Sequence, residues 1–268
     1  MVYQNILYEK EEGVAIITLN RPDKLNALDA GILQEIARAL KDVGEDDEIK
    51  ALIITGAGRG FCSGIDLTAE ISGVDPKQPG INRTVRIEPS VSLGWAVHQL
   101  RNLIKPTIAA VNGVTAGAGF SIASICDIRI ASEEARFSAV FVRRGLVPDN
   151  GLTYFLPRLV GTAKALELMW TGDMIDAREA ERIGLVTKVV PHQDLLQVAK
   201  ELAIRFAKGP SVAIELTKRM VYNGLETDDF SSQLAYETLA QTMCSQTEDV
   251  EEGRRSFLEK RDPVFKGI

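Results

Sequence analysis

Residues 107–126, TIAAVNGVTAGAGFSIASIC, are the stretch that decides the fold. The stretch begins with a short apolar run typical of a buried strand, continues through glycine-bearing backbone and ends in a helix-like run. Glycine adopts backbone angles that other residues avoid, and it lets a second segment approach closely. The first N–H groups of a helix have no partner within the helix, so a helix start favours negative charge. The stretch therefore predicts a strand, a glycine turn and a helix whose start can hold an anionic group.

A second stretch of the same kind, ALIITGAGRGFCSGID, covers residues 51–66. Two strands that end in flexible backbone can form plain tight turns, bind a phosphate, or direct two main-chain N–H groups at one developing oxyanion. A phosphate loop is disfavoured, because the sequence lacks Gly-Lys-Ser/Thr and its glycines do not have the dinucleotide-fold spacing. Tight turns and paired oxyanion donors both remain open on these grounds.

Strand-like and helix-like segments alternate along the first part of the chain. Residues 13–19 are rich in β-branched side chains, a helix is expected to begin at Asp29, and residues 51–55 form the next strand. A strand–helix–strand order implies parallel pairing, because parallel neighbours need a long crossover. The sequence therefore predicts an α/β fold.

The composition changes near residue 190, which predicts an α/β core over 1–190 and a helical C-terminal region over 191–268. The helices expected there span residues 194–208, 211–223, 230–245 and 250–260. Residues 68–90 contain several glycines and prolines and form a long irregular segment. Such segments are more often functional lids than neutral linkers.

Composition excludes several classes of function. The net charge is −6 and no Lys/Arg-dense run is present, which argues against a nucleic-acid partner. The 3 cysteines are scattered and the 2 histidines are far apart, so we expect free thiols and no metal site. The N-terminal residues do not resemble a signal peptide, and no apolar run is long enough for a bilayer. These features predict a cytoplasmic protein that does not contact membranes.

Several blocks along nearly the whole chain occur in a familiar order. They are residues 20–28 (NRPDKLNAL), 60–66 (GFCSGID), 105–127, 145–149 (GLVPD), 177–186 and 252–261. Together they resemble the enoyl-CoA hydratase/isomerase (crotonase) superfamily. The resemblance implies a crotonase-like spiral of ββα units, with C-terminal helices that form a trimer or a dimer of trimers. It also implies an acyl-CoA thioester as substrate, with coenzyme A as part of that substrate and no separate cofactor.

The resemblance assigns the two oxyanion donors to the backbone N–H groups of Ile65 and Ala118. Ile65 follows Gly64, and Ala118 lies between Gly117 and Gly119. Enolate formation from a thioester places negative charge on the carbonyl oxygen. Donors at that oxygen therefore stabilise the transition state more than the ground state.

The resemblance implies coenzyme A contacts for two segments, for the glycine turn and for the C-terminal region. The positions are Lys24, Leu25, Ala27, Ser63, Gly64, Asp66, Leu67, Gly117, Phe257 and Lys260. In the family, the positions of Phe257 and Lys260 approach coenzyme A from a neighbouring subunit. Lys24 and Lys260 have a second explanation as ordinary solvated surface lysines, which the sequence leaves open.

The acid/base residues favour isomerisation over hydration. Hydratases of the family use two glutamates, whose positions here hold Ser121 and Phe141, and neither side chain serves as a base near neutral pH. Asp149 matches the aspartate of acyl-CoA double-bond isomerases of the phenylacetate-pathway type, where one carboxylate moves a proton. Three alternatives remain: Asp149 as a helix N-cap, a hydratase with substitute acid/base residues, and a CoA-binding paralogue without catalysis.

Overall fold

The computed structural model describes residues 2–68 and 95–268, and within these ranges the strands form two sheets. The larger sheet has six strands in the order β1-β2-β3-β5-β7-β10, and the smaller has four in the order β4-β6-β8-β9. The larger sheet contains β1 (Ile6–Glu11), β2 (Val14–Leu19), β3 (Ala51–Gly56), β5 (Thr107–Val111), β7 (Ile128–Ser132) and β10 (Lys188–Val190). The smaller sheet contains β4 (Gly60–Cys62), β6 (Val114–Ala116), β8 (Arg136–Ser138) and β9 (Met174–Asp176).

One structural unit occurs three times within the residues that the structure describes. In each unit the first strand joins the larger sheet and the second joins the smaller sheet, giving the pairs β3/β4, β5/β6 and β7/β8. Strands of successive units are parallel neighbours in both sheets. The helices that follow the units are α3 (Trp95–Asn102), α4 (Ala118–Ile125) and α5 (Leu152–Val160). This arrangement is the spiral of ββα units that the family resemblance implied.

Alternation along the central strands sorts the apolar side chains into two cores. Ile16 and Ile53 face α8 (Leu195–Ala207), whereas Ile17 and Ile54 face the larger core that includes α1 (Ala30–Glu45). α1 begins where the sequence predicted, because the carboxylate of Asp29 accepts a hydrogen bond from the Ile32 N–H at 3.0 Å.

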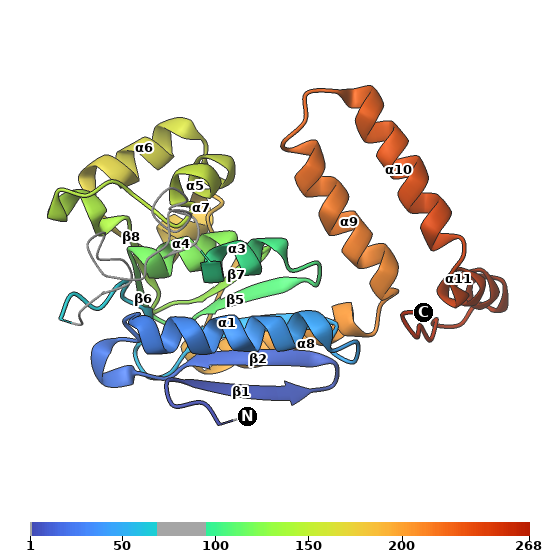
Figure 1. Cartoon of the computed structure of the whole chain (residues 1–268), viewed down its shortest axis with the longest axis horizontal. Helices are drawn as coiled ribbons and strands as arrows, with labels where there is room; N and C mark the ends of the chain where they lie inside the picture. Colours follow the sequence, from blue (N-terminus) through green and yellow to red (C-terminus); the bar gives the residue numbers. More distant parts are fainter. Residues whose placement is uncertain (1, 69–94) are drawn as a thin grey trace, which may run out of the picture.

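Three helices extend away from the sheets (Figure 1). They are α9 (Ser211–Gly224), α10 (Phe230–Cys244) and α11 (Glu248–Glu259). α8 differs from them, because Leu195, Ala199 and Ala203 pack under the larger sheet. The domain division at residue 190 stays a prediction, and this packing favours placing any boundary after α8.

The other elements connect these parts. They are the 3-10 helices η1 (Pro22–Lys24), η3 (Val140–Arg144) and η4 (His192–Asp194), with the α-helices α6 (Thr162–Thr171) and α7 (Ala177–Arg182). The expected irregular segment at 68–90 lies, apart from residue 68, outside the described residues. Among the residues that are described, no helix has both the length and the apolar content needed to cross a bilayer.

Candidate active site

The two glycine turns meet at the site. A methyl group added to Gly64 would lie 3.0 Å from the carbonyl oxygen of Ala116 and 3.4 Å from the nitrogen of Ala118. Gly64 has a φ of 97° and Gly117 has a φ of 52°, so both need the conformational freedom of glycine. The backbone of residues 64–65 therefore lies directly against the start of α4.

The N–H groups of Ile65 and Ala118 have no acceptor among residues 2–68 and 95–268. Ile65 forms a parallel bridge with Leu28, in which Leu28 N–H donates to Gly64 and Asp66 N–H donates to Leu28. The Ile65 N–H points away from that bridge, because alternate residues of a strand direct their N–H groups to opposite sides. Ala118 is the first residue of α4 and has no partner within the helix. Both residues line the same cavity.

The cavity is narrow, at about 20 Å³, and its walls are aliphatic. Its lining comprises Ile17, Leu19, Leu28, Leu33, Ile36, Ile54, Ile65, Ala96, Val97, Leu100, Ala118, Ile122 and Asn150. Asn150 is the polar side chain in this set. A wall of this kind suits the hydrocarbon part of an acyl group, with polar chemistry confined to the two N–H groups and the turn that contains Asn150.

Asp149 lies in that turn, between η3 and α5. Its carboxylate accepts a hydrogen bond from the Asn150 side-chain amide at 2.6 Å. Its main-chain carbonyl accepts one from the Ser121 hydroxyl at 3.0 Å and one from Leu152 N–H at 3.1 Å. The N-cap of α5 is Gly151, without a side-chain cap bond, so the alternative that Asp149 caps this helix through its carboxylate is wrong.

The environment of Asp149 makes it a stronger base than a free aspartate. Neighbouring protein atoms displace water and raise the pKa of its carboxyl, while the hydrogen bond from Asn150 acts in the opposite direction. The side chain still reaches solvent. A carboxylate with these properties can take a proton from an acidic carbon and release it again.

At the two positions where hydratases carry glutamates, this chain has a serine that donates a hydrogen bond and a phenylalanine that packs in the interior. Ser121 is fully buried in α4, and its hydroxyl holds the Asp149 carbonyl. Phe141 is buried in η3, with its ring next to Gly117. Neither position supplies an ionisable group near the paired N–H donors.

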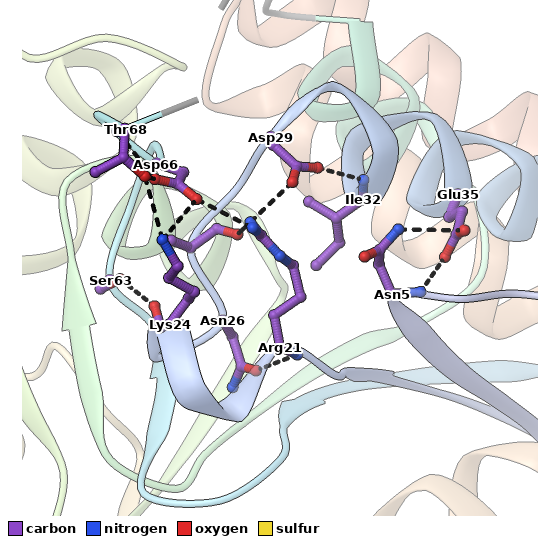
Figure 2. Close-up of polar contacts among 11 residues, drawn as sticks. Asn5, Arg21, Lys24, Asn26, Asp29, Ile32, Glu35, Ser63, Asp66 and Thr68 are labelled. Atoms are coloured by element: carbon purple, nitrogen blue, oxygen red, sulfur yellow. Dashed lines mark hydrogen bonds and ion pairs between the residues drawn. The ribbon is translucent and has the colours of Figure 1, made fainter. Parts of the chain in front are cut away.

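The segments expected to bind coenzyme A lie side by side. The Ser63 hydroxyl donates to the Lys24 carbonyl at 3.2 Å, and the Lys24 ammonium lies 3.2 Å from the Thr68 hydroxyl and 3.9 Å from the Asp66 carboxylate (Figure 2). Lys24 keeps about half of its side chain exposed, at 52%. The structure brings together, beside the turn at Gly64, the residues Lys24, Leu25, Ala27, Ser63, Asp66 and Leu67.

Arg21 organises these segments, and the sequence reasoning missed it. Its guanidinium donates to the Ala27 carbonyl at 2.6 Å and lies 3.0 Å from both the Asp29 and Asp66 carboxylates (Figure 2). Hydrogen bonds from Thr68, with further contributions from Arg21 and Lys24, lower the pKa of Asp66 to about 2. Asp66 is therefore occupied by internal partners. The available signal was Arg21 itself, a cation at the start of the block at residues 20–28, with acidic residues close by in the sequence.

Phe257 and Lys260 are not part of this assembly within one chain. Both are exposed at the end of α11, which lies at the far end of the C-terminal helices (Figure 1).

Within the described part of the chain, no group of three or more His, Cys, Asp or Glu side chains is placed to hold a metal ion. Cys62 and Cys126 are buried, and burial raises the pKa of each thiol to about 12, so neither is poised as a nucleophile.

Two N–H groups without an acceptor at an aliphatic cavity, carried by a spiral of ββα units, are the arrangement expected of a crotonase-fold enzyme. The sequence model described as enoyl-CoA hydratase/isomerase matches residues 9–268, and the chain belongs to this family. The expected family and fold are thereby confirmed.

Relatives within the family have different stated activities. The chain is 39% identical over 262 residues to a 1,2-epoxyphenylacetyl-CoA isomerase from Escherichia coli, covering 98% of each chain. It is 40% identical over 268 residues to a probable enoyl-CoA hydratase from Rhodobacter capsulatus, covering 100% of each. The crystal structure of an enoyl-CoA hydratase from Bacillus anthracis superposes with a TM-score of 0.88 at 34% identity, covering 99% of this chain and 100% of that one.

Proposed function

We propose that this protein shifts the double bond of an enoyl-CoA thioester. The observation that carries the proposal is one carboxylate, Asp149, hydrogen-bonded to Asn150, which lines the same cavity as Ile65 and Ala118. Ser121 and Phe141 stand in the places of the water-activating glutamates. Asp149 removes a proton from the α-carbon of a β,γ-enoyl-CoA, and the electron pair moves onto the thioester oxygen. Ile65 and Ala118 donate to that oxygen. Return of a proton to the γ-carbon then gives the conjugated α,β-enoyl-CoA, with no net gain or loss of atoms.

Coenzyme A enters as part of the substrate and lies along the edge formed by residues 24–27 and 63–67. Lys24 is the half-exposed cation of this edge and suits a phosphate. Phe257 and Lys260 complete the site only if a second copy of the chain brings its α11 to this edge. The cytoplasmic location stays a prediction.

We further propose a homo-oligomer, either a trimer or a dimer of trimers. Large apolar side chains are exposed on the C-terminal helices, including Val221, Leu225, Phe230, Leu234, Leu239, Met243, Phe257 and Leu258. Such a surface favours contact with another copy. Light scattering at micromolar concentration checks this, and a stable monomer would contradict it.

Hydration is the second candidate function, and the probable hydratase from Rhodobacter capsulatus is the observation in its favour. The isomerase relative from Escherichia coli supports the first candidate at nearly the same identity. We prefer isomerisation because Ser121 and Phe141 occupy the two glutamate positions. Water must lose a proton to attack, and neither side chain can accept it.

Initial rates on two substrates separate the candidates. Isomerisation of a β,γ-enoyl-CoA produces the absorbance of a conjugated enoyl thioester, whereas hydration of crotonyl-CoA removes it. We expect the first reaction at an enzymatic rate and the second to be slow. Hydration at about ten turnovers per second or more, with no isomerisation, would overturn the proposal.

A further inference from the structure

Asn150 combines a left-handed backbone conformation with a position in the lining of the cavity. Its φ is 50°, in the left-handed region, and Gly151 follows with a φ of 80°. Its side chain is the polar one among the described residues that line the cavity, and that lining also includes the donors Ile65 and Ala118. Its side-chain amide lies 2.6 Å from Oδ1 of Asp149. The turn therefore places an asparagine amide at the wall of an otherwise aliphatic cavity.

We propose that Asn150 is a positioning residue, which holds the Asp149 carboxylate in the orientation needed for proton transfer at the substrate. This inference rests on the proposed isomerase function. It adds a specific residue to that function, at a position where the carboxylate would otherwise have no side-chain partner among the described residues.

Two tethers fix Asp149 at different points. Ser121, from the oxyanion helix α4, holds the main-chain carbonyl, and Asn150 holds the side chain. An exposed aspartate without the second tether samples several rotamers, and small misplacements of a reacting group slow catalysis strongly. Asparagine is suited to both tasks, because it tolerates the left-handed conformation better than most residues and has an amide donor.

Two of the three arginines on the neighbouring elements η3 and α5 have other partners. Arg143 of η3 pairs with Asp173, and Arg158 of α5 stacks on Tyr154 while Arg144 remains exposed. Asp149 makes no ion pair with any of the described residues. The hydrogen bond from Asn150 is therefore the principal side-chain influence that lowers the pKa of Asp149 against the effect of burial.

The test uses two variants of opposite design. Asn150→Gly keeps a residue that accepts the left-handed conformation and removes the amide. Asn150→Asp keeps the side-chain shape and replaces the donor with a second carboxylate. The measurement is the pH profile of kcat/KM on a β,γ-enoyl-CoA, together with kcat, KM and the melting temperature.

We expect kcat of Asn150→Gly to fall about tenfold at neutral pH, with KM and melting temperature nearly unchanged. The catalytic form is the carboxylate, so activity is lost as pH falls through its pKa. Removing a donor that lowers this pKa moves the acid limb to higher pH. Asn150→Asp moves it further, because a neighbouring negative charge disfavours ionisation of Asp149.

Two results would overturn the inference: an acid limb that stays in place in both variants, or an Asn150→Gly protein that fails to fold, which would make the residue structural. Asp149→Asn separates this from failure of the proposed function. If Asn150→Gly has wild-type kinetics while Asp149→Asn is inactive, only the role of Asn150 is disproved. An active Asp149→Asn, or a wild-type protein that does not isomerise the thioester, removes both.

Discussion

The two halves of the site are held in different ways. The half that we propose to hold the oxyanion, called the oxyanion half below, is made of backbone and is mostly buried. It is fixed by the bridge between Leu28 and Ile65 and by the Arg21–Asp66 ion pair. The base half is one side chain on an accessible turn, held by Ser121 and Asn150. The difference follows from the chemistry. In the proposed isomerisation, donors to an oxyanion must be in place before charge develops, which backbone ensures, whereas the base is a side chain that hydrogen bonds must orient.

Asp149→Asn gives the largest effect and tests the base half alone. Asparagine keeps the shape of the side chain but cannot take a proton near neutral pH. We expect turnover of a β,γ-enoyl-CoA to fall by about 10²–10⁴-fold, with little change in melting temperature or thioester affinity. Turnover assays, calorimetry and thermal melting check the three quantities. A comparable loss of binding would mean that Asp149 also supports the oxyanion half.

Gly64→Ala attacks the oxyanion half. The added methyl group meets the Ala116 carbonyl oxygen and the Ala118 nitrogen, so the two donors must separate. We expect turnover to fall by about 10²–10³-fold, the range for losing one oxyanion donor. Gly161→Ala is the control, since Gly161 has a φ of 79° and open space around it. The control loses stability through strain but keeps its turnover when folded. Equal turnover losses in both variants would argue against paired donors.

Ser121→Ala removes a link between the halves, and Ser124→Ala is its matched control on the same helix. Ser121 donates to the Asp149 carbonyl, while Ser124 donates to the Phe120 carbonyl at 2.8 Å, and both residues are buried. We expect each change to destabilise by about 1 kcal/mol. Turnover should fall several-fold for Ser121→Ala only, because that change loosens the turn that carries the base. Identical kinetics in the two variants would show that the link has no catalytic effect.

Asp66→Asn gives the smallest effect on turnover. It tests whether the ionised Asp66 carboxylate holds the backbone next to the Ile65 N–H in place. Its pKa of about 2 in the folded chain lies below the ~3.9 of an unfolded aspartate. The carboxylate therefore stabilises the fold above pH ~4, and this contribution disappears as pH falls toward about 2. We expect the variant to melt at a lower temperature at pH 7, with a difference from wild type that shrinks in acid. A difference independent of pH would contradict the ionic clamp.

Sequence alone predicted the backbone half of the site better than the side-chain half. The turns at Gly64 and Gly117 carry their own signal, because glycine at strand ends has a local cause, and the structure does bring them together. The clamp by Arg21 was missed, because residues 21 and 66 meet only through tertiary packing. The alternative N-cap role of Asp149 was wrong because the turn places Gly151, not Asp149, at the helix start.

The same contrast holds for the fold. The buried strands and the long helices α8 to α11 were predicted from their periodicity, with ends that differ by a few residues. The strand β1 was not predicted, because it is a charged edge strand with most of its side chains at least partly exposed. β9 and β10 have 3 residues each, which is too short for a periodic pattern, and their positions depend on pairing with β8 and β7.

The central claim is that one carboxylate removes the α-proton while the fixed N–H groups hold the enolate. A β,γ-enoyl-CoA deuterated at the α-carbon tests it most directly, with the loss of deuterium from that carbon followed by mass spectrometry. We predict that the wild-type protein removes the label at least as fast as it forms the conjugated product, and that Asp149→Asn binds the thioester but leaves the label in place. Loss of the label at the wild-type rate in Asp149→Asn would show that another group takes the proton, and would contradict the account.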